Sequence, residues 1–155
     1  MKFIKRIRFL FPVVCLIVVL SGCQNSGKDV ADGTDTNESE ILAYIIDFDS
    51  DNIDVDAVEW VTVPGSRADE LGITEEDAPS GFYIYNPDTL IEQYTLSTDC
   101  MITVLDWQNS YEPKIVSVDD FVAVLHERRE QNAFIPYTFE ITNGEITQIS
   151  EHYVP

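Results

Sequence analysis

Basic residues, histidines and catalytic motifs are scarce in this sequence. Its 155 residues include nine Lys and Arg against 28 Asp and Glu, which gives a formal charge of −19. Nucleic-acid binding needs a basic surface that releases counterions from the phosphates. The composition therefore argues against DNA or RNA as a partner. With two His and no Gly-x-Ser-x-Gly motif, neither a Ser-His-Asp triad nor a zinc site has its usual residues.

Long apolar runs are also lacking. The longest run, Phe9 to Leu20, has 12 residues, whereas a helix that spans a bilayer needs about 20. It follows a basic segment that ends at Arg8 and precedes Leu20-Ser21-Gly22-Cys23, which resembles the lipobox of bacterial lipoproteins. The resemblance implies that residues 1–22 are a removable signal peptide and that Cys23 becomes the first residue of the mature protein.

Lipidation is the main consequence of this resemblance. It implies a diacylglycerol on the Cys23 thiol, and palmitate is expected among its acyl chains. Two chains hold a protein on a membrane far better than one. We therefore expect anchoring on the extracytoplasmic face of the cell membrane, with the membrane and an unidentified protein or cell-wall component as partners. No cofactor is indicated apart from a weakly held calcium ion.

Free cysteine is then limited to Cys100, because Cys15 leaves with the signal peptide and Cys23 is lipidated. No intramolecular disulfide can form. Cys100 begins an apolar run and has no neighbouring His in sequence that would favour the thiolate. The pattern predicts a buried, inert thiol.

Two regions follow the signal peptide. Residues 23–39 contain the lipidated Cys and a polar stretch that cannot bury a core, so we expect a disordered linker. Residues 40–155 alternate apolar runs with turn formers, which is typical of one β-rich globular domain. Strands are predicted at 41–48, 53–62, 81–85, 90–96, 101–107, 134–142 and 145–153.

Turns and two helices are predicted between these strands. Asn143-Gly144 is the strongest hairpin signal, since a type I′ turn needs positive φ at both central residues. A single helical turn is expected from a capping Ser66 to Gly72. One longer helix is expected after the N-cap Ser117, with Asp120 three residues on. Its apolar stripe is Val118, Phe121, Val122 and Leu125, and Arg128 and Arg129 lie at its C-terminal end.

This order predicts a mainly β, α+β fold. We expect a small antiparallel, partly closed barrel that is OB-like, with the long helix covering one end and one short helix elsewhere. The alternative is an open α+β sheet with the helix across one face.

Three stretches resemble small exported proteins and lipoproteins of Gram-positive bacteria. They are 57–62, 81–87 and the chain end 142–155, which has the pattern Asn-Gly-x-Ile-x-x-Ile-x-Glu-x-Tyr-Val-Pro. The resemblance implies one exported domain and transfers no site, since that group has no established activity.

Asp47, Asp49 and Asp51 form the densest carboxylate spacing and are our candidate metal ligands for calcium. The spacing begins like an EF-hand loop, but Asn52 replaces the Gly of position six and Glu59 comes one residue too late. A solvated hairpin tip is the alternative interpretation.

Aromatic residues are the remaining feature. Tyr83 and Tyr85 share one face of their predicted strand, and Phe82 takes the other. They suggest a groove for a peptide or glycan, or else ordinary packing, together with the other aromatic residues of the sheet regions, which are Trp60, Tyr94, Trp107, Tyr111 and Tyr153. We expect an acidic binding or accessory domain with no catalytic residues. The alternatives are a small hydrolase that uses Asp and Glu, and a calcium-responsive surface domain.

Overall fold

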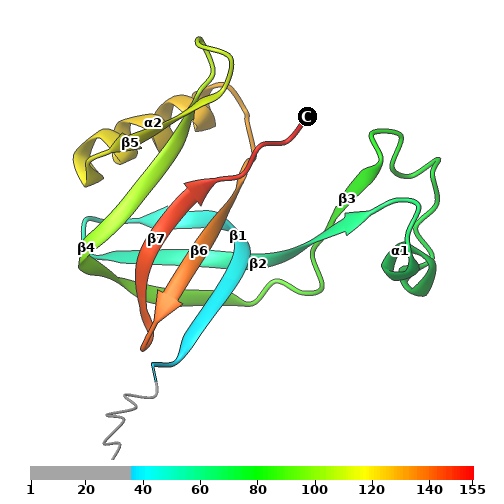
Figure 1. Cartoon of the computed structure of the whole chain (residues 1–155), viewed down its shortest axis with the longest axis horizontal. Coiled ribbons are helices and arrows are strands. Elements are labelled where there is room, and N and C mark those ends of the chain that lie inside the picture. The colour runs from blue at the N-terminus through cyan, green and yellow to red at the C-terminus, as the bar shows by residue number, and fades with distance from the viewer. Residues whose placement is uncertain (1–35) are drawn as a thin grey trace, which may run out of the picture. The chain divides into compact units, whose positions relative to one another are not determined.

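The computed structural model describes residues 36–155. This part is mainly β, with two helices and a seven-stranded sheet (Figure 1). The predictions for the signal peptide, Cys23 and the linker up to residue 35 lie outside the described residues. The elements are β1 Glu38–Phe48, β2 Asn52–Thr62, α1 Ser66–Leu71, β3 Phe82–Tyr85, β4 Ile91–Asp106, β5 Glu112–Val116, α2 Val118–Glu130, β6 Pro136–Thr142 and β7 Glu145–Glu151.

The strand order is β3-β2-β1-β6-β7-β4-β5, with a further pairing between β2 and β4. Most neighbours are antiparallel, but β4 and β7 run parallel, with Ile102 opposite Ile149. The sheet is therefore mixed, and the expectation of a purely antiparallel sheet was wrong. A parallel pair needs a long crossover, and between these strands the chain passes through β5, α2 and β6.

Both predicted hairpins are confirmed. Asn143 and Gly144 have φ of 54° and 86° between β6 and β7, which is the conformation that Asn-Gly favours. Between β1 and β2, a carboxylate oxygen of Asp49 accepts hydrogen bonds from the backbone N–H groups of Asp51 and Asn52, at 2.9 and 2.7 Å. β1 begins at Glu38, inside the predicted linker, because Glu38 already pairs with Thr142 of β6.

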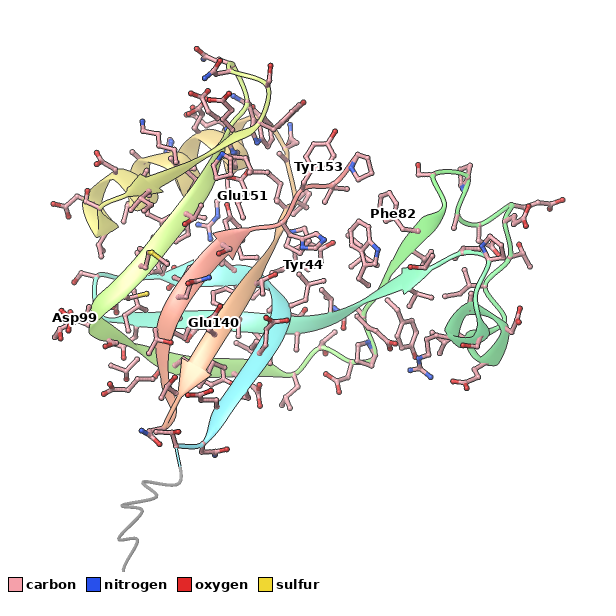
Figure 2. All side chains as sticks on the ribbon, viewed as in Figure 1. Tyr44, Phe82, Asp99, Glu140, Glu151 and Tyr153 are labelled. Carbon is pink, nitrogen blue, oxygen red and sulfur yellow. The ribbon has the colours of Figure 1, made fainter. Side chains whose placement is uncertain are left out.

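The predicted break in β4 was wrong. Ser97, Thr98 and Asp99 were expected to separate two strands, but all three lie inside one strand of 16 residues. The turn formers mark a register shift between Leu96 and Met101. Figure 2 shows Asp99 at the corner where β4 changes direction. The first half of β4 pairs with β2, the second half pairs with β5, and β7 pairs with residues on both sides of the bend. β5 itself was not predicted, since it is mostly exposed and contains a proline.

Helix α2 has the predicted N-cap. The Ser117 hydroxyl accepts from the Asp120 N–H and donates to the Asp120 carboxylate at 2.8 Å. The predicted apolar stripe is correct at Phe121 and Leu125, which are buried, and wrong at Val122, which is 46% exposed. Arg128 takes the fourth position of the buried stripe instead.

The short helix α1 lies where it was expected, but its cap differs. The N-cap is Gly65, and Ser66 is the first helical residue and makes no capping hydrogen bond. Gly72 ends the helix with φ of 71°, as a left-handed C-cap. In Figure 1, α1 and β3 extend away from the side of the sheet where α2 lies. They have their own small core, formed by Val61, Val63, Ala68 and Ala78.

The main core lies between the sheet and α2. Its largest fully buried side chains include Phe121 of α2 and Phe139 of β6. Phe121 makes edge contacts with Phe48 and Tyr137, at 5.4 and 5.6 Å between ring centroids. These contacts attach α2 to the sheet. Among residues 36–155, no helix is long and apolar enough to cross a membrane.

Candidate functional site

A buried ion pair joins the last turn of α2 to the sheet. Arg128 is 6% exposed, Glu151 at the end of β7 is 7% exposed, and Nε of Arg128 lies 3.3 Å from a carboxylate oxygen of Glu151. That carboxylate also accepts from the Leu105 N–H at 2.8 Å and from the Trp107 indole N–H at 2.9 Å. We call these four residues the Arg128–Glu151 network.

Arg128 makes two further contacts. One terminal N–H group donates to the Leu105 carbonyl at 2.9 Å. The guanidinium carbon lies 3.7 Å from the centroid of the Trp107 ring, which is a cation–π contact. The buried charges are thus paired and hydrogen-bonded, as a low-dielectric interior requires. The network attaches the last turn of α2 to β7 and to the end of β4.

The sequence analysis missed this network. The prediction that Arg128 lies at the C-terminal end of the helix is confirmed, but its burial and its pairing with Glu151 were not predicted. One signal was available: Arg128 follows Phe121 by seven residues and Leu125 by three, on the apolar face.

An aromatic surface lies beside the network. Trp60 of β2 stacks on Phe82 of β3 with centroids 4.2 Å apart and planes at 9°. Trp60 also contacts His152, with ring centroids 4.8 Å apart and planes at 53°. Tyr111 and Tyr153 meet edge to face at 5.0 Å, and they are 46% and 49% exposed. We call these five residues the aromatic site; Figure 2 shows Phe82 on β3 and Tyr153 on the facing C-terminal segment.

A hollow of about 130 Å³ lies in this surface. Tyr111, His152 and Tyr153 line its rim, and Trp107 and Glu151 of the network also contribute. A small apolar or aromatic side chain would fit a space of this size. Side chains of β3 alternate between two faces. Tyr85 packs on the small core, whereas Phe82 stacks on Trp60 and belongs to the aromatic site.

A second, more apolar pocket of about 330 Å³ opens at the C-terminal end of α2. We call it the helix-end pocket. It lies between α2, the segment that leads into β6, and a bulge in β1 between Ile45 and Asp47. The bulge inserts Ile46 as an extra residue, and such insertions redirect a side chain locally. The lining residues are Tyr44, Ile45, Ile46, Leu125, Arg128, Arg129, Ala133, Phe134, Ile135 and Tyr137.

The predicted calcium ligands are not brought together. One carboxylate oxygen of Asp49 is occupied by the backbone N–H groups of its own turn, and hydrogen bonds from that backbone, Asp51 first, lower its pKa. Asp47 pairs across the hairpin with Asp54. Within residues 36–155, no three His, Cys, Asp or Glu side chains are placed to hold a metal. Calcium binding at Asp47, Asp49 and Asp51 stays a prediction.

Other predicted chemistry is placed as follows. Cys100 is half-buried, and burial raises the pKa of its thiol to about 11. His126 is exposed and lies 3.6 Å from Glu130 on the same helix. The carboxyls of Asp49, Glu59 and Asp77 have lowered pKa values, because hydrogen bonds hold their charged forms. A general acid needs the opposite direction. Cys23, the predicted lipidation site, is outside the described residues.

Comparison of the chain with protein-family models, with curated protein sequences and with solved structures found no match. The site is therefore interpreted from its own geometry.

Proposed function

We propose that this protein is a binding module of the cell envelope. In this proposal it is anchored to the outer face of the cell membrane through lipidated Cys23, and it binds a segment of another extracytoplasmic protein at the aromatic site. The observation that carries the proposal is the row Phe82, Trp60 and His152 next to the half-exposed pair Tyr111 and Tyr153. Tyr111, His152 and Tyr153 of this site line the 130 Å³ hollow, and half-exposed aromatic rings around a hollow are typical of binding surfaces.

The negative net charge of the domain indicates which kind of partner it would attract. Residues 36–155 contain 25 Asp and Glu but only Arg67, Lys114, Arg128 and Arg129 as Lys or Arg. Such a surface attracts cationic segments and repels anionic ones. We therefore propose a basic protein segment that places one aromatic or aliphatic side chain in the 130 Å³ hollow.

We also propose that the fold is OB-like. β1 pairs with β2 and β6, β6 with β7, β7 with β4, and β4 with β2, so five strands form a circuit of pairings. The crossover helix α2 lies between β4 and β6 in sequence and packs on the core within this circuit. Both features support an OB-like arrangement, with α1 and β3 as an addition between its second and third strands.

The binding proposal is tested by titration of residues 24–155, which contain every described element, with the peptide Lys-Phe-Lys-Phe-Lys. Amide and indole NMR shifts report the site. We expect saturable shifts at Trp60 and Tyr153. The variants Tyr111→Ala and Tyr153→Ala should weaken binding about tenfold, as removal of an interface anchor does.

Tyr83→Ala is the matched control, because Tyr83 is also a half-exposed tyrosine but lies on the other face of β3. Its affinity for the peptide should change less than about twofold. Equal losses in all three variants, or equal binding of Asp-Phe-Asp-Phe-Asp, would disprove the proposed site. Shifts produced only by a neutral cell-wall glycan fragment would replace the protein partner with a glycan.

The anchor is tested separately. Cells that express the full chain are labelled with radioactive palmitate, and the membrane fraction is examined. We expect label in the wild-type protein and none in Cys23→Ser. An unlabelled wild-type chain in the cytosol would contradict the anchor and leave the aromatic site unaffected.

A further inference from the structure

The helix-end pocket carries an independent inference, because it is lined by an arginine with no carboxylate partner and by a tyrosine hydroxyl with no hydrogen-bond partner among the described residues. Its volume of about 330 Å³ corresponds to roughly a dozen non-hydrogen atoms, at about 30 Å³ for a water-sized group. None of the five aromatic-site residues lines it. A ligand here would therefore bind separately from the proposed protein partner.

The walls of the pocket are apolar and partly uncovered. Phe134 is 83% exposed and Ile46 is 44% exposed, and both contribute to the lining. Phe134 precedes β6 and pairs with no strand. Large apolar side chains that remain exposed beside a concave surface are typical of ligand sites. These two side chains would cover the apolar part of a ligand.

Arg129 supplies the positive charge. One terminal N–H group donates to the Ile46 carbonyl at 3.0 Å, so the β1 bulge holds the guanidinium beside the pocket. Within residues 36–155 no carboxylate lies within 4.0 Å of it, whereas Arg67 and Arg128 both have carboxylate partners. A guanidinium has five N–H donors, so most of those on Arg129 remain for a ligand.

Tyr137 supplies the second polar group. It lines the pocket and is 3% exposed, yet its hydroxyl has no hydrogen-bond partner among the described residues. An unsatisfied buried hydroxyl destabilises the folded state, and native structures rarely retain one without a reason. Burial raises the pKa of this hydroxyl, so it stays protonated and can donate at neutral pH.

We propose that the helix-end pocket binds a small apolar carboxylic acid, such as a free medium-chain fatty acid. Its chain lies against Ile46 and Phe134, and its carboxylate accepts hydrogen bonds from Arg129 and the Tyr137 hydroxyl. The ligand thereby neutralises the unpaired guanidinium and satisfies the buried hydroxyl. An anion of this class would approach the rest of this acidic surface poorly, so this position is selective.

The test is titration of residues 24–155 with octanoate, followed by isothermal calorimetry and by the amide shifts of Ala133 and Phe134. Arg129→Gln should weaken octanoate binding about 10- to 100-fold, the range expected for loss of a charge-assisted hydrogen bond. The matched control is Arg67→Gln, which removes the same charge from α1 and should leave octanoate binding within about twofold.

Two further variants test the pocket at positions where the substitution should not unfold the domain. Phe134→Ala changes an exposed side chain and should weaken octanoate several-fold without loss of the fold. Tyr137→Phe should weaken octanoate but leave the unfolding temperature equal or higher, because it removes a hydroxyl that has no partner. Tyr153→Ala should leave octanoate binding unchanged, which separates this site from the aromatic site.

Several results would overturn the inference. Octanol that binds as tightly as octanoate would exclude the carboxylate as the recognised group. Octanoate that binds equally to the wild type and to a folded Arg129→Gln variant would exclude the proposed contact. The absence of any heat or shift at millimolar octanoate would exclude the ligand class.

Discussion

At the residue scale, the Arg128–Glu151 network is the most consequential arrangement in the described structure. Four hydrogen bonds meet where α2, the end of β4 and β7 come together. A buried ion pair adds little stability compared with apolar residues of the same size, but loss of one partner leaves an uncompensated charge. The intact pair therefore contributes little to the free energy of unfolding, whereas loss of either partner alone costs much more.

Glu151→Gln should for this reason destabilise the domain by about 3–5 kcal/mol, as removal of one buried partner does. Urea unfolding of residues 24–155 measures the change. The matched control is Glu140→Gln, on an exposed position of the neighbouring strand, which should cost less than about 0.5 kcal/mol. The double variant Arg128→Met with Glu151→Leu should recover much of the loss. A loss under about 1 kcal/mol in Glu151→Gln would contradict the network.

Cys100 allows a second prediction at this scale. Its thiol pKa is raised from 9.0 to about 11 by burial, so the thiolate fraction at pH 8 falls about 100-fold. Alkylation by iodoacetamide in the folded state should be slow at pH 8 and should increase up to about pH 11. Mass spectrometry of the Cys100 peptide follows the rate, and the urea-unfolded chain is the control. An equal rate in both states at pH 8 would contradict a buried, protonated thiol.

At the scale of elements, α2 shows which signals are local. Its cap at Ser117 was predicted because capping involves residues three apart in sequence. The burial of Arg128 and the exposure of Val122 were not predicted, because they depend on which face of the helix packs on the sheet. The same holds for β4, where turn formers at 97–99 produced a bend in the strand instead of its end.

Ser117→Ala should destabilise the domain by about 1 kcal/mol through the loss of this cap. Ser66→Ala is the matched control, because Ser66 makes no capping hydrogen bond at α1; we expect a change below about 0.5 kcal/mol. Thermal unfolding measures both. Equal losses in the two variants would mean that the Ser117 side chain does not act as a cap.

At the scale of the whole molecule, like-charge repulsion is the dominant electrostatic feature. Residues 36–155 contain 25 Asp and Glu but only four Lys and Arg. One of these four, Arg128, is buried. High net charge of one sign destabilises a compact state through self-repulsion. Salt should therefore act as a stabiliser.

Raising NaCl from about 20 mM to 500 mM at pH 7 should raise the unfolding temperature by about 2–5 °C, because the Debye length falls below the spacing of surface charges. Differential scanning calorimetry measures the shift. At pH 3 most carboxylates are protonated, so the same addition should give a smaller increase. A decrease with salt at pH 7 would show that attractive surface pairs outweigh the repulsion.

The sequence by itself determined what short-range chemistry controls. The hairpin at Asn143-Gly144, the cap at Ser117, the mainly β fold and the acidic surface all follow from residues close together in the chain or from composition. The tertiary structure decided the parallel pairing of β4 with β7, the partners of Glu151 and the placement of Arg129 beside Ile46, 83 residues away. Such contacts depend on how the sheet bends and which helix face it buries, and these outcomes are settled only when the whole core packs together.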